Sequence, residues 1–96
     1  MVYAARMAHP PVHPNVVLKS YWRASWSDSP EPLSGRPIEV RSGRLPAEAP
    51  EHCARCGAGG LQPHDASDDS GTAWRQLFFQ FHCESCGAYS LFHYDD

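Results

Sequence analysis

All four cysteines of the chain lie in two short units, Cys53-Ala-Arg-Cys56-Gly57 and Cys83-Glu-Ser-Cys86-Gly87. A Cys-x-x-Cys turn places two thiolates on one side, where the backbone amides that follow the first sulfur stabilise its charge. The glycine after each pair suits a turn position that requires a positive φ angle. Two such turns facing each other would enclose a single tetrahedral site made of sulfur. The chain is therefore predicted to fold around a metal ion.

A closed shell of thiolates is typical of structural zinc sites. We therefore expect one structural Zn²⁺ ion, held by Cys53, Cys56, Cys83 and Cys86. Residues 57–82 place 26 residues between the pairs, more than the roughly 15–20 of the common spacing template. This gap predicts an extended loop between the two turns.

The similarity of the two units extends beyond the cysteines, because each is preceded by histidine and followed by Gly-Ala (His52 to Ala58 and His82 to Ala88). Paired turns of this kind closing on one ion make residues 51–96 resemble a zinc ribbon. The resemblance implies a fold and a metal, but no activity, since ribbons serve many functions.

Other uses of four cysteines remain open. Disulfides are common in small secreted proteins, but the N-terminus lacks the apolar run of a signal peptide and no segment approaches the length of a membrane span. A cytoplasmic location with reduced thiols, and no membrane, is expected. Rubredoxins also use two Cys-x-x-Cys-Gly turns, commonly with proline in the second, to hold iron for electron transfer. The Cys-Glu-Ser-Cys turn here departs from that pattern.

An enzymatic role is not expected. Catalytic zinc needs an open coordination position and a nearby acid or base, whereas four cysteines close the shell. His52 and His82, which directly precede cysteines, are interpreted as hydrogen-bond donors to the sulfurs or as ordinary polar residues. His9 and His13, among three prolines, are expected to be solvated.

The expected elements are strands and loops. Residues 1–15 predict an extended arm rich in proline and histidine, and residues 16–50 a β extension with strands at 16–26 and around Ile38 and Val40. In the ribbon, 59–71 predicts an exposed acidic loop, 74–82 a strand and 88–94 its antiparallel partner. No helix is expected, so the fold class is all-β: a zinc ribbon with an N-terminal β-strand extension.

Alternation divides the predicted strand at 74–82 into two faces. Leu77, Phe79 and Phe81 occupy one face, and the other carries Gln76, Phe78, Gln80 and His82. In the N-terminal strand, Trp22, Ala24 and Trp26 share a face. The aromatic residues are expected to form the core. Phe78 is the exception, because the alternation places it on the polar face of its strand, and it is a candidate for partner contact.

Charge separates the two halves of the chain. Residues 1–50 carry six basic and four acidic side chains (+2), and residues 51–96 carry two basic and seven acidic ones (−5), which add to the net −3. An acidic ribbon favours a basic protein partner, with Asp65, Asp68 and Asp69 as candidate contacts. Nucleic-acid binding would require clustered arginines, for which the candidates are Arg23, Arg36, Arg41 and Arg44.

These observations favour a small structural zinc protein that acts as an accessory or adaptor in an intracellular protein assembly. A nucleic-acid-binding or transcription-associated ribbon is the first alternative, and it is disfavoured by the acidic second half. A rubredoxin-like electron-transfer protein is the second.

Overall fold

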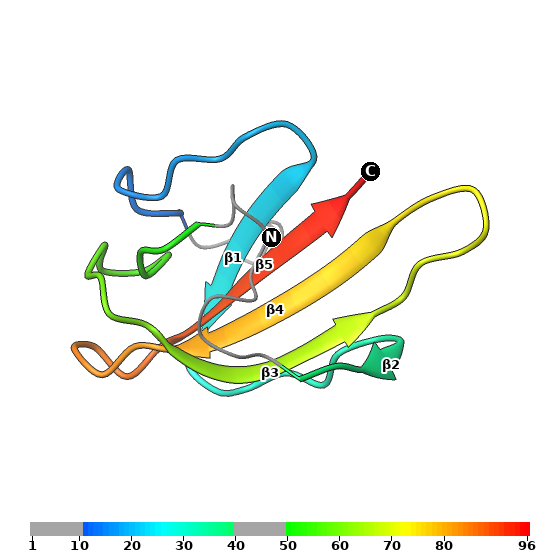
Figure 1. Ribbon diagram of the computed structural model, residues 1–96. Helices are drawn as coiled ribbons and strands as arrows, with labels where there is room; N and C mark the ends of the chain where they lie inside the picture. Colours follow the sequence, from blue (N-terminus) through cyan, green and yellow to red (C-terminus); the bar gives the residue numbers. More distant parts are fainter. Residues whose placement is uncertain (1–10, 40–49) are drawn as a thin grey trace, which may run out of the picture.

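A computed structural model describes residues 11–39 and 50–96, which form one antiparallel sheet (Figure 1). Its strands are β1 (Trp22–Ser27), β2 (Arg36–Pro37), β3 (Gln62–Asp68), β4 (Gln76–His82) and β5 (Tyr89–Asp95). Their order across the sheet is β1-β5-β4-β3-β2. The described residues contain no helix, which confirms the expected all-β class. No helix long and apolar enough to cross a bilayer occurs in this part of the chain.

One face of the sheet carries the core. Leu77, Phe79 and Phe81 of β4 are buried, as their alternation predicts. Phe79 pairs in register with Ala66 of β3 and with Phe92 of β5, and directly paired residues share a face. Burying a side chain of this size stabilises the fold by about 1.5–3 kcal/mol. The whole buried cluster comprises Val16, Trp22, Ala54, Ala66, Leu77, Phe79, Phe81 and Phe92.

The opposite face is crossed by the connection between β1 and β2. This connection, residues 28–35, takes the chain from one edge of the sheet to the other (Figure 1). Gln80 donates a hydrogen bond from Nε2 to the carbonyl of Glu31 at 3.1 Å, and the hydroxyl of Ser67 donates to the carbonyl of Ser34. Gln80 and Ser67 are therefore buried although they lie outside the aromatic core.

The N-terminal strand begins later than predicted. Residues 16–26 were expected to be extended throughout, but β1 starts at Trp22. Tyr21 has a φ angle of 74°, and Trp22 donates a backbone hydrogen bond to the carbonyl of Lys19 at 3.2 Å. A positive φ angle breaks an extended strand, so the predicted strand is wrong before Trp22, while Trp22, Ala24 and Trp26 do share a face of β1.

The segment expected to be an acidic loop contains a strand. Residues 62–68 form β3, which pairs with β4, with an irregularity in register between Pro63 and Asp65. Only Ala66 and Ser67 of this strand are buried, so its other positions can carry polar residues. The apolar alternation that predicts a strand is therefore missing from its sequence.

A second difference from the expected elements concerns the short strand around Ile38 and Val40. The paired residues are Arg36–Pro37, and Ile38 adds a backbone hydrogen bond to the carbonyl of Ala66 at 3.0 Å. Val40 lies outside the described residues. The strand thus occurs slightly earlier than its apolar residues indicate, because its pairing with β3 decides its bounds.

Candidate metal centre

The first Cys-x-x-Cys unit forms a tight turn, here called the first knuckle (residues 53–58). The amide of Gly57 donates to the carbonyl of Cys53 at 2.9 Å, and the amide of Cys53 donates to the carbonyl of Ala58 at 2.8 Å. Gly57 has a φ angle of 79°, a conformation that costs a residue with a Cβ atom about 1–2 kcal/mol. The predicted role of this glycine is therefore confirmed.

The second knuckle (residues 83–88) repeats this backbone. Gly87 donates to the carbonyl of Cys83 at 2.8 Å, Cys83 donates to the carbonyl of Ala88 at 2.9 Å, and the φ angle of Gly87 is 81°. The repeated sequence therefore has the same local structure at both places. The second knuckle joins β4 to β5, whereas the first precedes β3, so both lie at one end of the sheet.

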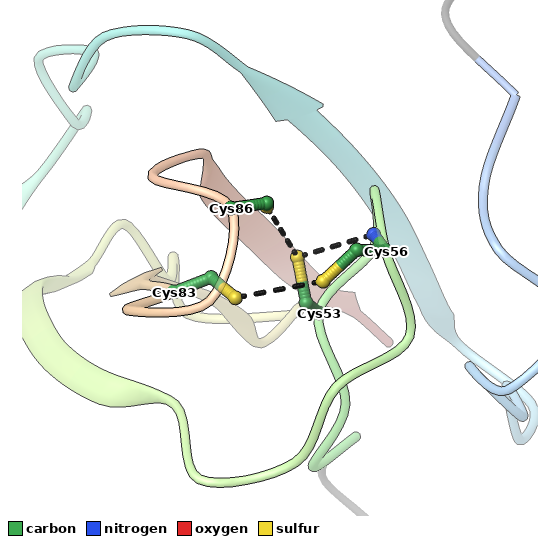
Figure 2. A group of neighbouring side chains, drawn as sticks. All are labelled: Cys53, Cys56, Cys83 and Cys86. Atoms are coloured by element: carbon green, nitrogen blue, oxygen red, sulfur yellow. Dashed lines mark hydrogen bonds between the residues drawn. The ribbon is translucent and has the colours of Figure 1, made fainter.

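The four sulfurs of the two knuckles converge (Figure 2). The Sγ atoms of Cys53 and Cys86 are 3.7 Å apart, and those of Cys56 and Cys83 are also 3.7 Å apart. All four lie within 4.8 Å of one another. A disulfide would require an S–S distance of about 2.05 Å, so the thiols are free. Four cysteines placed in this way can bind a metal ion.

The sulfurs differ in their readiness to ionise. At Cys53, burial opposes ionisation, but the amides of Cys56 and Arg55 and the hydroxyl of Ser90 outweigh it and lower the pKa to about 6. At Cys56, the amide of Ala58 favours the thiolate, but loss of water around the sulfur and the neighbouring thiols prevail and raise its pKa to about 12. Cys53 therefore ionises more readily than Cys56, and metal binding to a protonated thiol releases its proton.

Ser90 is a contributor to the centre that the sequence reasoning missed. Its side chain is fully buried; its hydroxyl accepts a hydrogen bond from the amide of Ala54 at 2.9 Å and donates to the sulfur of Cys53 at 3.8 Å. Ser90 pairs in register with Phe81, so it lies on the core face of β5. The sequence feature that could have indicated this role is a small polar residue at a core-facing position of a strand whose other core residues are aromatic.

The two histidines that precede the knuckle cysteines differ in their surroundings. His52 is exposed, and His82 packs its ring against that of Tyr89 with centroids 4.9 Å apart. In the described part of the chain, the sulfur of Cys53 accepts hydrogen bonds from the amides of Arg55 and Cys56 and from Ser90, in addition to its contact with the Cys86 sulfur. The amides after the first sulfur thus act as the motif predicts.

The end of the predicted arm packs against the first knuckle. His13 donates its backbone amide to the carbonyl of Ala54 at 2.8 Å, and the side-chain amide of Asn15 donates to the carbonyl of Gly57 at 2.9 Å. His13 is half-buried rather than solvated, which corrects the expectation for that residue; His9 lies outside the described residues. Val12 and Val16 add apolar contacts with the core.

Arg55 connects the first knuckle with its surroundings. Its guanidinium lies over the ring of Trp26 at 5.3 Å from the centroid and donates to the carbonyl of Cys86 at 3.4 Å. The indole of Trp26 in turn donates to the carbonyl of Pro11 at 3.0 Å. A charge in the middle of the first Cys-x-x-Cys pair therefore contacts both the second knuckle and the N-terminal strand.

The three candidate acidic contacts lie along β3 and just after it. Asp65 is exposed and accepts from the amide of Ala66 at 2.9 Å, whereas Asp68 and Asp69 are half-buried. Hydrogen bonding by Ser70 holds the pKa of Asp68 below its usual range, and the nearby arginines add to this effect. Asp68 therefore also stabilises the turn that follows β3.

The remaining partner candidates are dispersed. Phe78 stacks on His93 with centroids 4.3 Å apart, and burial lowers the pKa of that histidine. Arg23 lies in β1, with its guanidinium 3.9 Å from Asp95, and Arg36 lies in β2 at the opposite edge of the sheet. Arg41 and Arg44 lie outside the described residues.

The four cysteines are the metal-binding group that residues 11–39 and 50–96 bring within coordination reach. No protein-family model matches the sequence, and comparisons with curated proteins and with solved structures found no match. The chemistry of this centre and the charges around it are therefore what indicate a function.

The two knuckle glycines give the first prediction. Gly57→Ala and Gly87→Ala each place a Cβ atom at a positive φ angle, which costs about 1–2 kcal/mol. The Cβ atom at position 57 would also lie 2.4 Å from the His13 ring, whereas at position 87 nothing lies within 4 Å. We expect Gly57→Ala to lower the unfolding free energy more and to shift the amide NMR signals of His13 and Asn15. Equal losses with unchanged signals would contradict the packing of the arm.

Ser90→Ala gives the second prediction. It leaves the buried amide of Ala54 without its partner, which costs about 1–3 kcal/mol, and removes a donor to the sulfur of Cys53. We expect weaker metal binding by about 10–100-fold, measured by competition with a chelator. Ser85→Ala, at an exposed position of the second knuckle, is the control. It should change neither the unfolding free energy nor the affinity for metal. The role of Ser90 is wrong if both variants behave like the unmodified chain.

Proposed function

We propose that the four cysteines hold one structural zinc ion. Sulfurs about 2.3 Å from a tetrahedral Zn²⁺ ion are separated by about 3.8 Å, and two sulfur pairs across the knuckles, Cys53–Cys86 and Cys56–Cys83, are each 3.7 Å apart. This match in spacing is the observation that carries the proposal. Few other divalent ions compete with zinc for a site made of thiolates. Zinc bound here would have its shell filled by protein, which suits a structural rather than a catalytic role.

We further propose that the zinc-bound sheet is a non-enzymatic accessory or adaptor in a protein assembly. Residues 51–96 carry a net charge of −5, and a zinc ion with four thiolates adds about −2. A surface of this sign attracts a basic protein surface and repels phosphate. Free thiols at the centre fit a reducing compartment such as the cytoplasm.

The placement of the described arginines favours a protein partner over nucleic acid. Phosphate binding requires basic side chains gathered on one surface, but Arg23 and Arg36 belong to strands at opposite edges of the sheet. Each also lies near an acidic group: Asp95 in one case and Asp68 in the other. These two positions therefore do not form a phosphate-binding patch.

The metal itself gives the third prediction. Protein purified without added metal should contain about one zinc per chain by elemental analysis. Cys83→Ser should unfold the hairpin of β4 and β5, because a ligand is lost, whereas His82→Ala should retain most of the affinity for zinc. Iron with a visible charge-transfer band would instead favour electron transfer. Two disulfides without metal would overturn the zinc proposal.

The adaptor function gives the fourth prediction. Changing Asp65, Asp68 and Asp69 to asparagine should weaken capture of a protein partner from source lysate, because attraction to a basic surface is lost. A matched control changes three exposed acids of the other half, Asp28, Glu31 and Glu39, to their amides and should leave capture unchanged.

The same purified protein should be titrated with labelled single-stranded and duplex nucleic acid. We expect negligible binding at physiological salt. Affinity tighter than the roughly 10⁻⁴–10⁻⁶ M of nonspecific complexes, with a steep dependence on salt, would favour the nucleic-acid alternative and contradict the adaptor function.

A further inference from the structure

The two knuckles have the same backbone but are covered differently. Gly57 is buried, and a Cβ atom built on it would meet His13 and Asn15. Gly87 is exposed, and a Cβ atom there would meet nothing within 4 Å. The sequence repeat is thus matched by local structure, but the N-terminal arm packs on the first copy, whereas the second copy receives the Arg55 guanidinium at its Cys86 carbonyl.

The first knuckle shows which groups such a turn can accept. Its contacts with the arm use two outward carbonyls: Ala54 accepts a backbone amide, and Gly57 accepts the side-chain amide of Asn15. The segment that supplies these donors is a turn, because the amide of Val16 donates to the carbonyl of His13 at 3.0 Å. Pro14 lies between the two donors and restricts the backbone of this turn. A knuckle of this sequence therefore binds a turn-forming segment through a main-chain donor followed by an amide side chain.

The second knuckle presents the equivalent acceptors to solvent. By position in the repeat, Glu84 corresponds to Ala54 and Gly87 to Gly57. Glu84, Ser85 and Gly87 are exposed, and in residues 11–39 and 50–96 no hydrogen-bond donor meets the carbonyl of Glu84 or Gly87. The replacement of alanine by glutamate adds a negative charge beside these two acceptors.

We propose that the second knuckle is a docking site for a turn-forming segment of a partner protein that carries a side-chain amide and a basic residue. The amide would donate to the carbonyl of Gly87, a main-chain amide to that of Glu84, and the basic side chain would pair with the Glu84 carboxylate. The proposal rests on the adaptor function and names the chemistry of the partner. The occupied first knuckle supplies the geometry, and Glu84 supplies the charge that distinguishes the two sites.

An aromatic group at the base of the second knuckle extends this surface. His82 and Tyr89 flank the knuckle and pair in register across β4 and β5. The ring of Tyr89 contacts that of His82 at 4.9 Å and that of His64 at 5.1 Å between centroids. His64 is exposed and the other two side chains are half-buried. Apolar residues flanking the docked segment can pack here, as Val12 and Val16 pack beside the first knuckle.

A peptide titration tests the docking site. The probe is a synthetic peptide, Lys-Pro-Val-His-Pro-Asn-Val-Lys, which copies the segment bound to the first knuckle and adds basic ends. It is added to the ¹⁵N-labelled, metal-loaded full chain. We expect saturable shifts of the amide signals of residues 84–87, because the peptide would supply both donors and the positive charge.

Two matched variants sharpen the test. Glu84→Lys should weaken peptide binding by about fivefold or more, since it replaces attraction by repulsion. Glu51→Lys makes the same charge change at an exposed position before the first knuckle and should change affinity by less than about twofold. A peptide with leucine in place of asparagine should bind several-fold more weakly, because the hydrogen bond to Gly87 is lost.

Three results would overturn the docking site: no saturable shifts, shifts confined to residues 54–57 through displacement of the arm, or equal effects of the two lysine variants. If a lysate partner is still lost on neutralising Asp65, Asp68 and Asp69 in that case, the adaptor function stands and only the docking site is wrong. Saturable binding at residues 84–87 without any partner that depends on these acids would overturn the adaptor function instead.

Discussion

The structure depends on the convergence of two turns that are thirty positions apart in the sequence. Sulfurs from both knuckles come within 4.8 Å of one another at one end of the sheet. A module of about forty residues, close in size to the segment that carries both knuckles, rarely buries enough apolar surface to fold alone. A zinc ion bound here would add a folding free energy on the order of 10–16 kcal/mol. This is comparable to or larger than the whole net stability of a typical domain. The proposed metal would thus hold β4 and β5 to the segment that begins β3.

Asymmetry in the use of two similar turns links the fold to the proposed function. Part of the first knuckle is buried: Ala54 donates its amide to the Ser90 hydroxyl, and the arm contacts Gly57, whereas Arg55 and Cys56 are exposed. The second knuckle has the same hydrogen bonds but remains at the surface. The backbone of this turn is held by its own hydrogen bonds, and within the described residues the carbonyls of Glu84 and Gly87 accept none. These two carbonyls can therefore accept from a partner without a rearrangement of the turn.

Sequence patterns predicted the parts of the fold that carry alternating apolar residues. The residues of β4 and β5 alternate between buried aromatic and more polar side chains, and both strands were expected close to where they lie. The polar strand β3 was missed because a sheet can bury a strand's backbone while leaving most of its side chains at the surface. Pairing with the next strand, β4, across the connection at residues 69–75 decides its structure, and backbone pairing of a polar strand leaves little mark on the local sequence.

The sequence alone determined the four cysteines of the candidate metal site, the tight turns that carry them and the need for glycine after each pair, because these depend on spacing and on backbone sterics within a few residues. The tertiary structure decided which other groups meet the centre. Ser90 approaches Cys53 only because β5 runs beneath the first knuckle, and Asn15 reaches Gly57 only because the arm folds back over it. Contacts between residues this far apart form only when the strands assemble into the sheet, so no local sequence pattern predicts them.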